Sequence, residues 1–350
     1  MQTIPKKNNF DHIRHLLALG VFLFHVSELT QIAQFRPFNF FVDASVAVHS
    51  FFIVSGFLIF MSYEKSHSLK RYLHKRFRRI VPGYATVILL SFLFLSLLST
   101  LPLHDYFTSP ESFKYLMANL ATLNFIHPSL PGVFTENHYT AVNGALWTIK
   151  VEVAFYLSVP LIVYLFRRAA PWKILSITFA LSTLYFFMTA HLYHTEDNHL
   201  YTALHHQLPA QMMFFIGGAL IYYYIDHFRR YSSILITLAI FVYLGQRLIG
   251  LELLFPLYAL SLSVIVIYLA IILPYLGHIS KYGDLSYGIY IWHFPMIQTF
   301  IALHLFDGHP WATLSGLLLL IFLLAWLSWH LIEKPFLDRR SHYVQESEAD

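Results

Sequence analysis

The 350-residue sequence contains no cysteine. This absence excludes disulfide bonds, a thiolate metal site and a cysteine nucleophile, although it does not identify a compartment. Charge is also scarce, because only 12% of the residues are Asp, Glu, Lys or Arg, against about 25% in an average soluble domain. Together with 57% hydrophobic residues, this composition is typical of a polytopic membrane protein.

We also expect no cleavable leader and no appended soluble domain. Lys6 and Lys7 precede the first apolar run, but no small-residue cleavage site follows it, so we expect a retained first span. The sequence contains no evident internal repeat or low-complexity linker. We therefore predict a single transmembrane domain over residues 1–338 and a short cytoplasmic tail over residues 339–350.

Apolar runs of about 20 residues predict an all-α polytopic protein with about ten transmembrane helices. The predicted spans cover residues 10–30, 41–62, 80–100, 146–166, 172–190, 209–227, 233–249, 253–273, 285–304 and 311–332. Of the 23 Lys and Arg residues, 19 fall on the side of the N-terminus. By the positive-inside rule, both termini are expected in the cytoplasm. Topology therefore explains the net charge of +4 better than nucleic-acid binding does.

The first predicted span combines apolar length with ionisable side chains. It carries Asp11, Arg14, His25 and Glu28. At about 100° per residue, the eleven steps from Arg14 to His25 return to nearly the same helix face, about 16 Å further along the axis. Because ionisable groups inside a span usually face a protein interior or a water-filled cavity, we interpret this face as a functional seam. For either residue alone, snorkelling of Arg14 and simple packing of His25 are the alternatives.

The fourth predicted span opens with LWTIKVEVAFYLSVP at residues 146–160. Glu152 lies about 9 Å below the expected outer surface, at a depth similar to that of His25, so the two side chains are a candidate pair. A carboxylate within a span indicates function. Trp147 fits either the interfacial aromatic belt or the lining of a site. Lys150 is two positions from Glu152 and is expected to point elsewhere.

A basic segment, RYLHKRFRRIVPGY, occupies residues 71–84. Arg76 and Arg79 are three residues apart, so on a helix they share a face. Paired guanidinium groups suit phosphate oxygens, although cytoplasmic anchoring explains the same run. We expect Pro82 near the start of the third span, where its missing N–H is tolerated.

Two further positions could line a site. Ser55 and Gly56 form a small pair in the second span, where a neighbouring helix or a thin ligand can approach the backbone. His293 lies in the ninth span, within LSYGIYIWHFPM at residues 285–296, and could face a cavity. Pro295 is expected to kink the same helix.

The outer connections carry weaker signals. In the long connection at residues 101–145 we expect an interfacial helix from Glu111 to Asn124. The connection at residues 191–208 contains histidines at 191, 194, 199, 205 and 206 with Glu196 and Asp197 nearby. Their spacing is not typical of a metal site, so no metal is predicted.

Taken together and in order, these stretches resemble the acyltransferase-3 family of bacterial integral-membrane glycan O-acyltransferases. The resemblance covers nearly the whole chain and is to the stand-alone form, without the esterase-like domain that many relatives carry. The matching stretches are FDHIRHLLALGVFLFH, FFIVSGFLI, the Arg-x-x-Arg spacing of Arg76 and Arg79 before IVPGY, LWTIKVEVAFYLSVP, LSYGIYIWHFP and the closing IEKPF at residues 332–336. His49 departs from the family pattern, which often has an acid at that position.

The resemblance implies a membrane-bound O-acetyltransferase of the bacterial inner membrane. Such an enzyme moves acetyl from cytoplasmic acetyl-CoA to a hydroxyl of a cell-surface polysaccharide, which could be O-antigen, capsule or exopolysaccharide. Arg14, Arg76 and Arg79 would hold the donor phosphates, and His25 would act as general base. Glu152, or else Glu28, would orient its ring. The expected partners are acetyl-CoA, a free or lipid-linked glycan and the bilayer, with no bound cofactor.

Four alternatives stay open at this point. Acetyl could pass through a transient acetyl-imidazole on His25, and a longer acyl group such as succinyl could replace acetyl. A transporter or flippase of a lipid-linked glycan would use the buried charges to line a path without making a bond. A non-catalytic scaffold for envelope assembly would need none of this chemistry.

Overall fold

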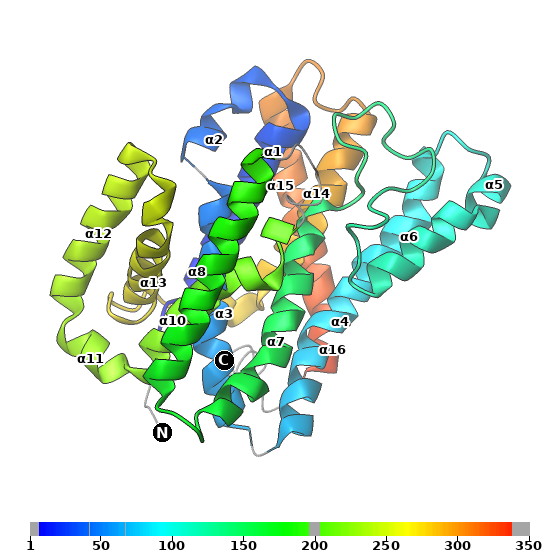
Figure 1. The fold of residues 1–350 in the computed structure, drawn as a ribbon. Coiled ribbons are helices and arrows are strands. Elements are labelled where there is room, and N and C mark those ends of the chain that lie inside the picture. The colour runs from blue at the N-terminus through cyan, green and yellow to red at the C-terminus, as the bar shows by residue number, and fades with distance from the viewer. Residues whose placement is uncertain (1–6, 42, 67, 196–203, 338–350) are drawn as a thin grey trace. The chain divides into compact units, whose positions relative to one another are not determined.

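The computed structural model describes residues 7–41, 43–66, 68–195 and 204–337 (Figure 1). Across these residues the regular structure is helical, with no strand. Each predicted span overlaps one long helix, so the all-α prediction is confirmed. These helices are α1 (Phe10–Thr30), α3 (Ala44–Glu64), α4 (Leu69–Phe94), α7 (Trp147–Leu165), α8 (Pro171–Thr195), α10 (Leu208–Tyr223), α12 (Ser232–Ile249), α13 (Phe255–Ile271), α14 (Leu285–Ala302) and α15 (Pro310–Leu327).

Shorter helical segments connect the long helices. In chain order they are η1 (Ala33–Phe35), α2 (Pro37–Phe41), η2 (Leu95–Leu98), α5 (Leu103–Thr108), α6 (Pro110–Leu120), η3 (Gly144–Leu146), α11 (Ile225–Arg230), η4 (Glu252–Leu254), η5 (Ile279–Tyr282), η6 (Ser328–Glu333) and α16 (Lys334–Phe336).

Within the described ranges, eight helices are long and apolar enough to cross a membrane. The two predicted spans outside this group are α10 and α14. Helix α10 has only 16 residues and is buried on most sides, so its length need not match a lipid bilayer. Helix α14 has 18 residues but includes polar side chains such as His293 and Gln298. The protein is therefore a multi-pass, all-α membrane protein.

The chain divides into two compact units built from interleaved segments. The first unit comprises residues 1–13, 48–73 and 151–277, and the second comprises residues 14–47, 74–150 and 278–350. The expected domain over residues 1–338 stays a prediction. The expected tail at residues 339–350 lies outside the described residues.

In the first unit, α10 packs against α8 and α13, while α12 packs against α13. Glycines allow α3 and α10 to approach most closely. A Cβ on Gly56 would collide with the Phe215 carbonyl, and a Cβ on Gly218 would collide with the Ile53 carbonyl. Helix α10 is therefore the neighbour that packs closely against Gly56, as small residues in a helix interface allow.

In the second unit, α14 packs against α15. Gly288 makes this possible, since a Cβ at that position would lie 2.7 Å from the Ala325 Cα. Helix α15 continues into η6, which is a π-helical turn. A π-turn adds a residue to the helical repeat and is frequent at functional sites. Here the turn ends with Glu333 buried.

The basic segment at residues 71–84 is part of helix α4 and does not precede the helix. It begins at Leu69, so Pro82 lies in the helix interior. The predicted position of Pro82 near the start of the span was therefore wrong. Lys and Arg are good helix formers, and they extend the helix beyond the apolar run. Arg76 and Arg79 consequently lie on one helix, as the spacing required.

The long outer connection contains α5 and α6. The Ser109 hydroxyl accepts a hydrogen bond from the Glu111 backbone N–H at 3.2 Å, and Pro110 occupies the first turn of α6. These are common features of a helix start. The interfacial helix expected from Glu111 is confirmed as a helix as far as Leu120. It ends near Thr122, whose φ of 62° leaves the helical region.

Each unit exposes large apolar side chains. Phe241 and Leu248 of α12 in the first unit are 76% and 86% exposed, and Leu319 of α15 in the second unit is 71% exposed. On helices of this length, such surfaces suit contact with lipid tails.

Candidate active site

The face of α1 that carries Arg14 and His25 lies toward α14 and toward Asp284, the residue just before α14. Arg14 Nη1 lies 3.3 Å from Asp284 Oδ2. His25 Nδ1 lies 2.9 Å from His293 Nε2. The two side chains that the spacing placed on one face therefore both meet polar partners in the second unit. The Arg14 side chain is only 12% exposed.

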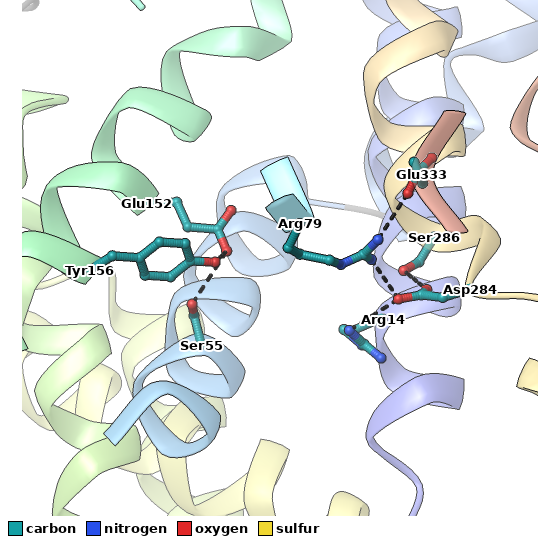
Figure 2. Close-up of polar contacts among 8 residues, drawn as sticks. All are labelled: Arg14, Ser55, Arg79, Glu152, Tyr156, Asp284, Ser286 and Glu333. Atoms are coloured by element: carbon teal, nitrogen blue, oxygen red, sulfur yellow. Dashed lines mark hydrogen bonds and ion pairs between the residues drawn. The ribbon is translucent and has the colours of Figure 1, made fainter. Parts of the chain in front are cut away.

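Around Arg14 the second unit contains an arginine–carboxylate cluster of Arg14, Arg79, Asp284 and Glu333 (Figure 2). Arg79 bridges the two acids, because its Nη2 lies 2.6 Å from Asp284 Oδ2 and its Nη1 lies 2.8 Å from Glu333 Oε2. Both carboxylates are buried. Charge-assisted hydrogen bonds of this kind are strong and hold the guanidinium in a fixed orientation.

Two serines complete the hydrogen bonding of these acids. Ser286 donates to Asp284 Oδ1 at 2.6 Å, and Ser328 donates to Glu333 Oε1 at 2.9 Å. Burial opposes the ionisation of Asp284, but the guanidinium groups of Arg14 and Arg79 outweigh it. They hold the pKa of the Asp284 carboxyl below its usual range. Asp284 is therefore an anion that fixes both arginines.

Aromatic rings flank the Arg79 guanidinium. Its carbon lies 5.3 Å from the ring centroid of Tyr287 and 5.8 Å from that of Trp329. Gly283 has φ 110° and leaves room for Trp329, since a Cβ there would collide with the indole ring. Cation–π contacts at these distances add to the ion pairs. The side chain of Arg79 is thus held on several sides.

The His25–His293 pair occupies an aromatic environment. His293 is fully buried, whereas His25 is half-buried. The Phe294 ring meets His25 edge-on with centroids 5.2 Å apart. Gly144 allows this arrangement, because a Cβ at that position would lie 2.9 Å from the Phe294 ring.

The outer connection compensates for Pro295 in α14. Pro295 has no N–H, so the carbonyl of Ile291, four residues earlier, lacks its helical partner. Asn143 Nδ2 donates to this carbonyl at 2.9 Å. The Asn143 side chain also accepts from the Ala145 N–H at 3.3 Å, at the start of η3. Asn143 therefore attaches the part of α14 that contains His293 to the outer connection.

Gln298 makes a second attachment between α14 and the outer connection. Its Nε2 donates to the carbonyls of Tyr139 at 2.6 Å and Ala141 at 2.9 Å. Asn137 Nδ2 in turn donates to Gln298 Oε1 at 3.0 Å. Lys150 also turns toward this connection, with its ammonium 4.1 Å from the Phe125 ring centroid. The expectation that Lys150 points elsewhere than Glu152 agrees with this contact.

Glu152 lies in a polar group of the first unit, drawn in Figure 2 with Ser55 and Tyr156. Ser55 Oγ donates to Glu152 Oε1 at 3.5 Å, and the Tyr156 hydroxyl donates to the same oxygen. Tyr156 is one turn after Glu152 on α7, so its contact follows from the helical spacing. The pairing of Glu152 with His25 stays a prediction, because the two residues belong to different units.

The remaining candidates have varied surroundings. Arg76 is half-buried on α4, and Trp147 is the first residue of α7. Glu28 accepts a hydrogen bond from Asn39 Nδ2. The His49 ring stacks on Phe214 with centroids 3.7 Å apart. The functional roles of these residues stay predictions.

The histidine-rich outer connection is only partly described. His199, Glu196 and Asp197 lie outside the described residues. Among the residues that the structure does describe, no three His, Asp or Glu side chains are placed to hold a metal ion.

Sequence reasoning missed Asp284 and Glu333. Each carboxylate adjoins an apolar segment, and Glu333 lies within the IEKPF stretch. The rule applied to Glu152 concerns carboxylates within a span, and both of these acids lie just outside the predicted spans. Asn143 carried no comparable signal, because its role depends on a proline far away in the sequence.

Comparison with known proteins gives one consistent result. A family model described as an acyltransferase domain matches residues 7–332. The O-acetyl transferase of Shigella phage Sf6 is 27% identical over 344 residues, covering 96% of this chain and 98% of the relative. Nodulation protein 10 of Rhizobium leguminosarum bv. viciae is 26% identical, covering 97% of this chain and 95% of the relative.

A third relative is longer than the chain. The peptidoglycan O-acetyltransferase OatA of Listeria monocytogenes is 24% identical and covers 93% of this chain, but only 55% of that relative is matched. No solved structure matches the chain.

Proposed function

We propose that this chain, which belongs to the acyltransferase domain family and is an acyltransferase, transfers acetyl from acetyl-CoA to a hydroxyl of a cell-surface polysaccharide. Two similar proteins are named as O-acetyl transferases. The Shigella phage Sf6 protein is matched over nearly its whole length, and the Listeria protein is named for peptidoglycan as its acceptor. The observation that carries the proposal is the pairing of the half-buried His25 on α1 with the buried His293 on α14, together with the fixed group of arginines that includes Arg14 of the same helix α1. It supplies a proton acceptor within the membrane domain.

In the proposed reaction His25 is the general base. The acceptor hydroxyl gives its proton to His25 while its oxygen forms a bond with the acetyl carbonyl carbon. The carbon–sulfur bond of the thioester then breaks, and the proton passes from His25 to the leaving thiolate. The products are the O-acetylated polysaccharide and CoA. In the alternative route, a ring nitrogen of His25 bonds to the acetyl carbon as the carbon–sulfur bond breaks, and the acceptor oxygen then replaces that nitrogen while the hydroxyl proton passes to the CoA thiolate.

Arg14, Arg76 and Arg79 are the proposed donor site. Guanidinium groups suit the phosphates of CoA, and Arg14 and Arg79 already lie together at Asp284. Separating Arg79 from two buried carboxylates would be costly. We therefore expect the donor to bind with these ion pairs in place, so that Asp284 and Glu333 fix the orientation of the arginines.

Glu152 is proposed to act on the acceptor side. Its carboxylate, which is held by Ser55 and Tyr156, orients the acceptor hydroxyl in this proposal. The proposed location is the bacterial inner membrane, with the donor entering from the cytoplasm.

The test compares surface polysaccharides by mass spectrometry from cells that produce the wild type, His25→Ala or His304→Ala at equal membrane levels. His304 is the control, because its side chain is 79% exposed. The acetyl mass increment should be present with the wild type and His304→Ala and absent with His25→Ala. Undiminished acetylation in His25→Ala would contradict the proposal. Loss of polysaccharide export with acetylation unchanged would favour a transporter.

A further inference from the structure

The proposed base, His25, has a backbone hydrogen bond with Val21 and a buried side-chain partner, His293. His293 Nε2 lies 2.9 Å from His25 Nδ1, and His293 Nδ1 lies 3.2 Å from the backbone carbonyl of Ile289, one turn earlier on α14. Each ring nitrogen of His293 is therefore within hydrogen-bond distance of a specific atom.

A carbonyl oxygen can only accept a hydrogen bond, so His293 Nδ1 must carry a proton to bond with Ile289. The reverse arrangement would direct the lone pair of Nδ1 at the lone pairs of the carbonyl. In a neutral imidazole the other nitrogen, Nε2, then has no proton and accepts. The donor in the 2.9 Å contact is consequently His25 Nδ1–H.

We propose that His293 is a positioning residue that fixes His25 in the tautomer with its proton on Nδ1 and its lone pair on Nε2. Resting on the proposed function, this inference assigns Nε2 as the atom that removes the acceptor proton. When Nε2 takes that proton, His25 becomes a cation and its Nδ1–H still donates to neutral His293. The Nδ1 proton therefore stays on His25 throughout the transfer, while Nε2 takes the acceptor proton.

This arrangement differs from a serine-hydrolase triad, in which a carboxylate accepts from the base. A neutral imidazole avoids an additional buried charge, which is costly within a membrane domain. His293 is fully buried and its ring lies 5.8 Å from that of Tyr290, whose hydroxyl is 2.7 Å from Thr148 Oγ1. These contacts, with the attachment of Ile291 to Asn143, restrict the ring orientation on which the tautomer depends.

The first test is spectroscopic. The full chain is labelled with ¹⁵N-histidine, placed in lipid nanodiscs and studied by solid-state NMR, and His25 is assigned among the 21 histidines by difference from His25→Gln. We expect His25 with a protonated Nδ1 and an unprotonated Nε2. His25 found with its proton on Nε2 would overturn the inference, even if His25 proved to be the base.

The second test uses a matched pair of amides in place of His293. In His293→Gln the amide oxygen reaches the position of Nε2 and can accept from His25. In His293→Asn the shorter side chain reaches the Ile289 carbonyl but not His25. We expect kcat to fall by about 10²-fold or more in His293→Asn, on the scale of a lost general base or wrong tautomer, with KM for acetyl-CoA unchanged.

His293→Gln should keep kcat within about tenfold of the wild type, since one hydrogen bond is only reshaped. The NMR spectrum should show protonated Nδ1 of His25 in the Gln variant and loss of that preference in the Asn variant. Equal activities of the two variants, or an unchanged His25 tautomer in both, would overturn the positioning role. Full activity of His25→Ala would instead refute the proposed function on which it rests.

Discussion

At the scale of single residues, Arg79 links two acids of the second unit. It is the common partner of two buried carboxylates, Asp284 and Glu333. A buried charge that loses its partner is far more costly than an exposed ion pair is valuable. The residue that the sequence suggests for binding phosphate is thus also required for the local structure around it.

Replacing Arg79 should therefore reduce stability as well as activity. Arg79→Ala should lower the free energy of unfolding by about 3–5 kcal/mol, the usual cost of breaking a buried pair. Arg79→Lys should have a smaller effect, because one ammonium retains the charge but cannot bridge both acids. Thermal unfolding of the purified protein in detergent measures both. The control is Arg71→Ala, whose side chain is exposed on the same helix.

Loss of activity in Arg79→Ala at unchanged stability would assign Arg79 to the donor alone. The interpretation of the cluster as a structural support would then be wrong.

Asp284 predicts a specific dependence of stability on pH. Its pKa is depressed in the folded protein, so its contribution to stability is present above its unfolded pKa of about 3.9 and is lost as the pH falls below that value. The stability difference between the wild type and Asp284→Asn should shrink below about pH 4. Unfolding midpoints measured across this range would show it. A difference that grows on acidification would contradict the ion-pair assignment.

At the scale of secondary-structure elements, Pro295 and Asn143 form a coupled pair. The proline removes one helical hydrogen bond from α14, and the asparagine of the outer connection replaces it at the Ile291 carbonyl. A buried carbonyl without a partner costs about 1–3 kcal/mol.

Asn143→Leu should therefore lower the stability by about 1–3 kcal/mol. Addition of Pro295→Ala should recover part of this loss, since an alanine N–H can bond to the same carbonyl. A double-mutant cycle on the unfolding of the purified protein isolates this coupling. Additive effects of the two substitutions would mean that Asn143 does not act through the Ile291 carbonyl.

At the scale of the whole molecule, the sequence predicts the helices better than it predicts the contacts between residues far apart in the chain. Hydropathy and length located all ten long helices in the part of the chain that the structure describes, because a span must be apolar and must satisfy its own backbone. The eleven-residue interval on α1 correctly placed Arg14 and His25 on the face that meets polar groups.

The unpredicted features depend on contacts between distant segments. Arg79 meets Asp284 and Glu333 across more than 200 residues of sequence, and no local pattern specifies such pairs. The π-turn that buries Glu333 also has no simple sequence signal. The interior position of Pro82 shows the limit of reading a helix start from a proline.

The predicted topology of the whole chain can be tested independently of the chemistry. The excess of Lys and Arg on one side predicts that both termini are cytoplasmic. A fluorescent protein fused to either end should fold and fluoresce, whereas alkaline phosphatase at the same end should be inactive. The opposite result at one terminus would mean that the chain crosses the membrane an odd number of times.

The most direct measurement of the central claim is acetyl transfer by the purified chain in proteoliposomes supplied with labelled acetyl-CoA and a polysaccharide acceptor. The wild type and the His304→Ala control should transfer the label to an acceptor hydroxyl and release CoA. His25→Ala should bind acetyl-CoA but transfer at least about 10²-fold more slowly, as expected for loss of a general base. Transfer by folded His25→Ala at the wild-type rate would contradict the assignment of His25 as the base.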